Sequence, residues 1–371
     1  MNSKELLKKY IYDQDNNFVP YGYNMWKSLL SSLVSKFSSL GFEEGYFYNQ
    51  DLKEVHLNNS RYQMSNKIID NNLAHVSISE YENMIEGAKT NMIDILQAYI
   101  STIKNVLSLN LISGKLISNS KEERYIIGGY IENEGFTKVG EVSFYEDSGR
   151  YKVYSYLKSN VIDLMVKINN DDRGLIVSPG ASKHQVVIIP LKMNEANVLN
   201  KTRELRQKLE SLDYSIFLDE RKESDENKLL EALESGTPLI LEVGPRDINN
   251  KVVELIKRTE NSILSIDEDK VLSYISNFLK KVGIDLLNRQ IKIFMNSSIN
   301  SNNINDALKM YEEGKIINVI WDGKEESFNV IKTQFKNAYI YLPFNQELFN
   351  EIDIISKERG RYVLSICKKI L

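Results

Sequence analysis

A short apolar run that ends in a glycine-proline turn constrains this chain more than any other stretch. Residues Leu239–Val243 are apolar apart from one glutamate, and the run is short enough for a buried strand. Gly244-Pro245-Arg246-Asp247 follows directly. Glycine allows backbone angles that other residues resist, and proline fixes φ at about −65°. We therefore expect a strand that stops abruptly and presents Arg246 and Asp247 at its carboxyl end, where ligands usually sit in an open α/β sheet.

Arg246 and Asp247 form a pair that suits recognition of guanine. The guanidinium can donate to O6 and N7, while the carboxylate can accept from N1 and N2. A surface ion pair that closes a tight turn is the other interpretation of the same residues. A net charge of −4 and a pI of about 5.7 exclude a broadly basic surface, so any contact with nucleic acid must be local.

The segments on either side of this run alternate between strand and helix patterns, in an order typical of a compact α/β domain. The expected strands are 185–191, 214–221 and 251–257, and the expected helices are 195–212, 227–235 and 267–282. The N-terminal part has a different pattern, typical of an antiparallel sheet with long helices. Its expected helices are one that ends near residue 40 and one over about 80–109, and its expected strands are 125–131, 141–145 and 151–156.

Cysteine and histidine usage argues against a metal centre. The single cysteine, Cys367, excludes a disulfide within the chain and a cysteine cluster for zinc, and His56, His75 and His184 lack metal-ligand spacing. No apolar run approaches the roughly 18 residues of a membrane span, and the charged N-terminal stretch differs from a signal peptide. We expect a cytoplasmic protein of two or three domains, with no metal, no cofactor and no membrane partner.

Several stretches, in order and at matching spacing, resemble prolyl-tRNA synthetase of the eukaryote and archaeon type, a class II aminoacyl-tRNA synthetase. The pieces "QVVIIPL", "FLDER", "SGTPLILEVGPRD" and "KVVELIKR" resemble its anticodon-binding domain, "VPYGYNMWKSLL" its motif 1, and "AYIYLPFNQE" its C-terminal domain. The resemblance implies a homodimer built through the motif 1 helix and an α/β fold class with three domains. These are a truncated α+β catalytic-like domain with an antiparallel sheet at 1–182, an α/β anticodon-binding-like domain at 183–283, and a small α+β C-terminal domain at 284–371.

Counting along the motifs implies that the catalytic positions have lost their charges. Met64 and Ser65 stand where motif 2 has arginine and glutamate, and Asn160 and Tyr156 stand where motif 3 has arginine and glycine. Amino-acid activation needs cations beside the α-phosphate. The pattern therefore predicts a degenerate paralogue without prolyl-tRNA ligase activity and without catalytic or cofactor-binding residues. His75 matches a histidine near the family's amino-acid pocket, and a buried core histidine is the alternative interpretation.

The resemblance also implies that half of the anticodon-reading set has become apolar. Leu233 and Ile240 stand at the positions of the family's glutamate and arginine, whereas Lys228, Arg246 and Asp247 match its pattern. We expect RNA binding through Lys228, Arg246 and Asp247, with guanine discrimination weakened by about 1–3 kcal/mol for each lost contact.

The C-terminal domain lacks the cysteines with which some family members hold zinc. Trp321-Asp322-Gly323 occupies the first cysteine site, residues 356–362 lie near the later pair, and Cys367 matches a position that is no ligand. We expect no zinc and a domain stabilised by packing alone.

The pattern leaves three functional hypotheses open. The first is a non-catalytic dimeric protein that binds or regulates tRNA, another RNA, or a protein partner such as an active synthetase. The second is an enzyme that keeps the pocket for a different chemistry, such as aminoacyl transfer or ligand sensing. The third is an accessory subunit that pairs with an active synthetase through the motif 1 helix, so homodimer and heterodimer both stay possible.

Overall fold

The chain falls into two compact units. The computed structural model describes residues 2–370 except 46–60, 70–72, 119–121 and 261, and it leaves the side chains of 64–69, 73–75 and 196 undescribed. The first unit contains residues 1–29, 105–108 and 165–287, and the second contains 30–104, 109–164 and 288–371. The mixture of sheets and helices confirms the expected α/β fold class, while the division into three domains stays a prediction.

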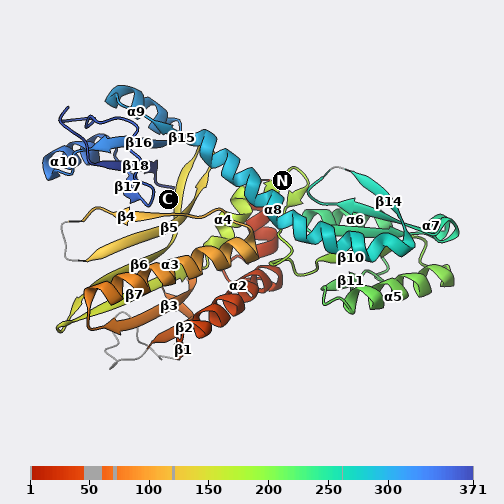
Figure 1. Cartoon of the computed structure of the whole chain (residues 1–371). Helices are drawn as coiled ribbons and strands as arrows, with labels where there is room; N and C mark the ends of the chain where they lie inside the picture. The colour runs from red at the N-terminus through yellow and green to blue at the C-terminus, as the bar shows by residue number, and fades with distance from the viewer. Residues whose placement is uncertain (1, 46–60, 70–72, 119–121, 261, 371) are drawn as a thin grey trace. The chain divides into compact units, whose positions relative to one another are not determined.

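A five-stranded sheet forms the centre of the first unit, in the order β11-β10-β12-β13-β14 (Figure 1). β10 (Val186–Pro190) pairs in parallel with β11 (Ile216–Leu218) and with β12 (Leu239–Val243). β13 (Val252–Lys257) and β14 (Ile263–Asp267) continue the sheet in the antiparallel sense. The apolar run Leu239–Val243 is therefore β12, the central strand of this sheet.

Both faces of this sheet are covered around β10, which explains why β10 is apolar and buried along its whole length. Val186 and Ile188 face a core that includes Leu209 and Leu279, while Val187 faces a second cluster that includes Ala232. The helices that supply these residues, with their bounds, are α5 (Ala196–Glu210), α6 (Asp225–Glu234) and α8 (Val271–Ser297).

Helix α6 begins and ends at residues with suitable chemistry. The Ser224 side chain accepts a hydrogen bond from the Asn227 backbone N–H, which caps the first turn. Gly236 follows the last turn with φ at +78°, a conformation that favours glycine. A Cβ at Gly236 would lie 2.7 Å from the Leu175 carbonyl oxygen, so a larger residue would force the chain apart there.

The first residues of the chain pack against the end of α6. They form α1 (Ser3–Leu6), a π-helical turn over Leu7–Ile11, and the start of α2 (Pro20–Ser39). Lys9 forms an ion pair with Glu234, and the Tyr10 hydroxyl donates to Glu234 Oε2 at 3.0 Å. The N-terminal segment therefore contributes side chains to the surface of the anticodon-binding-like region.

An eleven-stranded sheet forms the second unit, in the order β1-β2-β3-β7-β6-β5-β4-β17-β18-β16-β15. Its strands from the N-terminal part of the chain are β1 (Glu43–Glu44), β2 (Tyr62–Ile69), β3 (Leu73–Glu82), β4 (Ile112–Leu116), β5 (Glu123–Ile131), β6 (Gly135–Asp147) and β7 (Arg150–Lys158). Those from the C-terminal part are β15 (Ser298–Asn300), β16 (Ile316–Trp321), β17 (Ala338–Pro343) and β18 (Tyr362–Lys368). The two groups join where β17 pairs with β4. One sheet therefore contains strands from both the N-terminal and the C-terminal part of the chain.

The helices of the second unit complete its layers. α3 (Ile85–Leu107) lies across the antiparallel strands (Figure 1), with the Tyr99 hydroxyl 3.1 Å from the Ser155 hydroxyl on β7. α9 (Ile304–Glu312) and α10 (Glu325–Gln334) accompany the C-terminal strands. The expected helix over about 80–109 is wrong at its start, because Glu80 belongs to β3, which pairs with β7 as far as Glu82.

Helix α8 is longer than the expected helix over 267–282. It starts at Val271 and continues to Ser297, so Gly283 does not end it and the predicted boundary at 283–284 falls inside it. A Cβ at Gly283 would lie 2.8 Å from the Ser108 hydroxyl oxygen, so this glycine allows close packing rather than a break. Among the described residues, no helix is both long enough and apolar enough to span a bilayer.

The remaining short elements are η2 (Glu268–Lys270), α4 (Val161–Ile168) and a small hairpin of β8 (Asn170–Asp171) and β9 (Gly174–Leu175).

Candidate nucleic-acid interface

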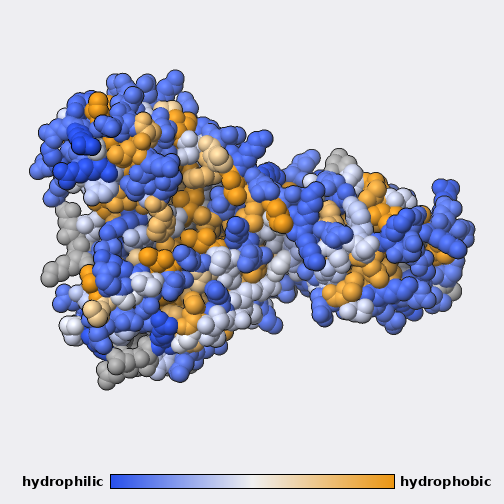
Figure 2. Space-filling view, in the orientation of Figure 1, coloured by the Kyte–Doolittle hydropathy of each residue, from blue (hydrophilic) through white to orange (hydrophobic). Residues whose placement is uncertain are grey.

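The Gly-Pro-Arg-Asp segment opens a helix rather than a loop. α7 (Pro245–Asn250) starts with proline in its first turn, and Asp247 Oδ2 accepts a hydrogen bond of 2.7 Å from the Gly244 backbone N–H. The surface over α7 is hydrophilic (Figure 2), and Arg246 is exposed. The expected tight turn is therefore the first turn of α7, in which Asp247 caps the helix while Arg246 faces solvent.

The two apolar residues at the positions expected to read the anticodon, Leu233 and Ile240, belong to the packing beneath α6. Ile240 is fully buried in the cluster between α6 and the sheet, and Leu233 packs against the same cluster. Hydrocarbon at both positions leaves no donor or acceptor for a base edge. The weakened guanine discrimination stays a prediction.

Lys228 is buried, whereas Arg246 is exposed to solvent. Its side chain is only 1% exposed, and its Nζ has no hydrogen-bond partner among the residues that the structure describes. It lines a cavity of about 290 Å³ together with Asp219 and Arg221, and neither Arg246 nor Asp247 lines that cavity. The structure thus divides the three predicted RNA-binding residues between a solvent-exposed helix start and a recessed pocket.

The pocket residues beside Lys228 were not singled out from the sequence. Arg221 donates from Nε to Asp219 Oδ1 at 2.9 Å and from Nη2 to Asp219 Oδ2 at 2.7 Å. Burial would raise the pKa of Asp219, but the hydrogen bonds and charge of Arg221 outweigh it and hold that pKa below its usual value. The available signal was the Asp-Glu-Arg ending of the expected strand, which does not reveal what faces it.

His75 lies in β3 opposite Lys158 of β7. Its side chain, like those of Met64 and Ser65 in β2, is outside the part of the chain that the structure describes. The pocket prediction for His75 and the prediction for motif 2 therefore stay predictions.

The position that resembles the motif 3 arginine makes a structural contact. Asn160 donates from Nδ2 to the Lys138 backbone carbonyl at 3.1 Å, just before α4. Lys138 Nζ lies 5.6 Å from the centre of the Tyr156 ring, so Tyr156 fills the space beside it. The neutral Asn160 here links two segments and carries no charge toward a ligand.

Two cations near Asn160 share one carboxylate, a cluster that sequence analysis missed. Arg124 donates from Nε and Nη2 to the two Glu141 oxygens, each at 2.8 Å, and Lys138 pairs with the same carboxylate. Burial would raise the pKa of Glu141, but Arg124 and Lys138 together lower it below its usual value. Glu141 is therefore ionised at neutral pH and holds both cations. Only the strand register, which the sequence does not contain, brings these three side chains together.

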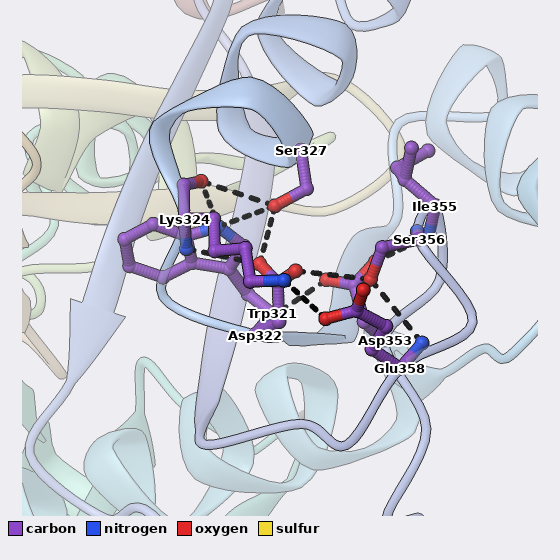
Figure 3. Close-up of polar contacts among 8 residues, drawn as sticks. All are labelled: Trp321, Asp322, Lys324, Ser327, Asp353, Ile355, Ser356 and Glu358. Atoms are coloured by element: carbon purple, nitrogen blue, oxygen red, sulfur yellow. Dashed lines mark hydrogen bonds and ion pairs between the residues drawn. The ribbon is translucent and has the colours of Figure 1, made fainter.

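The positions that resemble zinc-ligand sites carry a network of protein hydrogen bonds (Figure 3). Asp322 accepts from the Lys324 backbone N–H and from the Ser356 hydroxyl, each at 2.9 Å, and it also accepts from the Ser327 hydroxyl. Asp353, fully buried, accepts from the Asp322 backbone N–H at 2.9 Å. Among the described residues no group of three or more histidine, cysteine or acidic side chains could hold a metal ion. This polar network connects loops of a region that also has an apolar core, and stabilisation of the region without zinc stays a prediction.

Known proteins resemble this chain in two ways. Residues 185–278 match the family described as "Anticodon binding domain". The chain is also 30% identical to the proline–tRNA ligase of Methanobrevibacter smithii over 255 residues, which are 65% of this chain and 53% of that protein. It is 27% identical to the proline–tRNA ligase of Sulfurisphaera tokodaii over 220 residues, covering 57% of this chain and 46% of that protein.

The chain is 24% identical to the proline–tRNA ligase of Acetoanaerobium sticklandii over 366 residues, which are 94% of this chain and 72% of that protein. The chain spans about half the length of the Methanobrevibacter and Sulfurisphaera relatives. Together with the parallel-centred sheet and the α6–β12–α7 arrangement, these matches support a prolyl-tRNA-synthetase-like protein with an anticodon-binding domain.

Proposed function

We propose that this protein is a degenerate prolyl-tRNA synthetase paralogue that binds tRNA or another RNA in the cytoplasm and does not activate amino acids. One observation carries the proposal: Lys138, whose backbone carbonyl accepts from Asn160, and Arg124 are both already engaged by Glu141. A triphosphate needs cations that are free to follow the charge that develops on it during reaction. Here one ionised carboxylate offsets part of the charge of Arg124 and Lys138 and fixes the direction of both.

The anticodon-binding domain supports RNA as the ligand. Arg246 projects from the start of α7 into solvent, and it has no ion-pair partner among the described residues. Leu233 and Ile240 supply no base-reading groups, so the proposed binding depends on shape and phosphate contacts more than on guanine identity. Because the net charge of the chain is −4, the RNA would be bound through a local cationic patch that includes Arg246 and not through a broadly basic surface.

Binding of purified tRNA, measured by fluorescence anisotropy across a salt series, tests this proposal. We expect saturable binding at low salt that weakens as salt rises, with little preference between tRNA species whose anticodons do and do not contain guanine. An absence of binding at low salt, with the protein folded, would contradict the RNA ligand.

We also propose a homodimer through the exposed side of α2. The apolar residues Trp26, Leu29, Leu33 and Phe37 are at most 1% exposed within one chain, so they are not available to a partner. Tyr23, which is 51% exposed on the same helix, is available. Light scattering after size exclusion should give twice the chain mass for the protein alone. A monomer that becomes a heterodimer only with an active synthetase would instead support an accessory subunit.

A remodelled enzyme is the second candidate function. The Arg124–Glu141–Lys138 cluster beside Tyr156 favours it, because a fixed, ionised carboxylate between cations can orient a polar substrate. Incubation with preloaded prolyl-tRNA separates the two candidates. A binding protein leaves the aminoacyl ester at its uncatalysed lifetime, whereas a transferase or hydrolase shortens it, and Glu141→Gln should then restore the longer lifetime.

A further inference from the structure

The recessed pocket that contains Lys228 lies at one edge of the five-stranded sheet. Its volume is about 290 Å³, just below the roughly 300–1,000 Å³ typical of small-molecule sites. Its walls come from α6, from β10 and β11, and from the N-terminal segment through Tyr10 and Tyr21. A pocket of this size has room for about one nucleotide.

The Lys228 ammonium has no acceptor within this pocket among the described residues. The side chain is 1% exposed and Nζ makes no hydrogen bond. The Asp219 carboxylate, which also lines the pocket, is held by two hydrogen bonds from Arg221, and Arg221 also pairs with Glu231. Burying an ammonium without a partner costs several kcal/mol. An anionic oxygen in the pocket would accept from one of the three N–H donors that Lys228 presents and would offset its charge.

Aromatic rings line the same pocket as this cation. The His184 ring stacks on the Phe217 ring with centroids 5.0 Å apart and planes 23° apart. Burial and the nearby charge of Lys183 lower the pKa of His184, so its ring is neutral at neutral pH. A flat neutral surface beside a buried cation matches a base stacked on the rings with its phosphate on the ammonium.

The charges of the lining residues favour a phosphodiester over a free phosphate. The lining contains the cations Lys183, Arg221 and Lys228 and the carboxylates Asp219 and Glu231, so one positive charge remains. A phosphodiester carries a single negative charge, whereas a terminal phosphate carries about −1.5 to −2 at pH 7. The charge balance therefore points to a nucleotide inside a strand rather than to a free mononucleotide.

We propose that this pocket binds one unpaired nucleotide of an RNA strand, with its phosphate oxygen on Lys228 Nζ and its base against His184 and Phe217. The pocket is separate from the base-reading surface, because Leu233, Ile240, Arg246 and Asp247 do not line it. The inference rests on the proposed function in one respect, namely that the protein binds RNA.

The test combines crosslinking and affinity for a short oligouridine that carries 4-thiouridine. With the full-length protein, irradiation should crosslink the RNA to the peptide that contains Phe217 or to the peptide that contains Tyr10 and Tyr21. Lys228→Met should abolish that crosslink, weaken binding by about tenfold or more, and reduce the slope of log K against log salt by about 0.7. Lys270→Met is the matched control, because Lys270 is an exposed lysine in the same unit that pairs with Asp267.

A functional lysine and a structural lysine differ in one further readout. Lys228→Met removes an unpaired buried charge and keeps the methylene chain, so its unfolding midpoint should equal or exceed that of the wild type. Phe217→Leu, which keeps an apolar side chain, should lose the crosslink while Lys228 is intact. A gain in stability together with a loss of binding is not expected from a lysine that serves only the fold.

The outcomes separate this inference from the proposed function. RNA binding with crosslinks only near α7, unchanged in Lys228→Met, would overturn the pocket and leave the RNA-binding function. A complete absence of RNA binding would overturn both. Binding of uridine monophosphate without binding of the strand would overturn the strand as the source of the nucleotide.

Discussion

The ion pair between Asp171 and Arg258 offers the sharpest test of what holds the first unit together. Arg258 is fully buried, and it donates from Nη1 and Nη2 to the two Asp171 carboxylate oxygens at 2.8 and 2.6 Å. Its Nε donates to the Leu233 carbonyl at 2.9 Å. These contacts join the β8–β9 hairpin to the end of α6 and to the end of β13. Asp171→Ala removes one partner and leaves the guanidinium buried with a single acceptor.

The expected cost follows from what stays buried. Removing one partner of a buried pair typically destabilises a protein by about 3–5 kcal/mol, because the remaining charge is uncompensated. Asp171 is 29% exposed, so water can partly replace it, and we expect about 3 kcal/mol. Urea unfolding followed by circular dichroism measures this value. Asp269→Ala is the control, since Asp269 is exposed, and it should change stability by less than about 0.5 kcal/mol.

The same pair gives a signed pH dependence. Burial would raise the pKa of Asp171, but the hydrogen bonds and charge of Arg258 outweigh it and lower the pKa in the folded state. A lowered folded-state pKa gives stability that is present above the unfolded value of about 3.9 and is lost as pH falls through the folded value. Asp171→Asn should lack this component at neutral pH, so its stability deficit relative to the wild type should shrink as the pH falls below about 4. An Asp171→Ala protein that unfolds within about 1 kcal/mol of wild type at pH 7 would refute the reasoning.

Three further predictions follow from other contacts. Asp322→Asn should lower the free energy of unfolding in urea by about 1–3 kcal/mol, because one oxygen that accepts hydrogen bonds becomes an NH2 group that faces other donors. A chelator should leave the unfolding midpoint of the wild type unchanged, and a drop in that midpoint would argue for a bound metal. Gly236→Ala should destabilise the fold by about 1–3 kcal/mol or more, because φ is +78° and the Leu175 carbonyl oxygen would lie 2.7 Å from the new Cβ. The thermal unfolding midpoint measures this loss, and an unchanged midpoint would show that the turn relaxes. Arg246→Ala should weaken tRNA binding at low salt without changing the unfolding midpoint, and equal affinity would remove Arg246 from the interface.

Local patterns account for the elements that sequence analysis predicted well. The apolar residues of β12 and the glycine and proline after it indicate a strand that ends at Val243. Ser224 and Gly236 indicate the two ends of α6. The regular order of strands and helices was enough to predict the α/β class. These signals lie within a few residues of the elements that they define, so they are visible without the fold.

The features that sequence analysis missed depend on contacts between distant residues. The pairing of β4 with β17 joins residues more than 200 positions apart, and the Arg124–Glu141–Lys138 cluster depends on the register of β5 and β6. Gly283 suggested a helix end because glycine is a poor helix former, but close packing against Ser108 gives it another role. Lys228 matched a family pattern by its letter alone, and only the fold reveals that its ammonium is buried.

ATP–pyrophosphate exchange with proline tests the central claim most directly, with an active proline–tRNA ligase as the positive control. The account predicts no exchange above the background without enzyme, because Asn160 carries no charge and Glu141 already holds Arg124 and Lys138. Proline-dependent exchange that rises with protein concentration and disappears in an Arg124→Met, Lys138→Met double variant would contradict it, since those cations would then be serving a phosphate rather than a carboxylate.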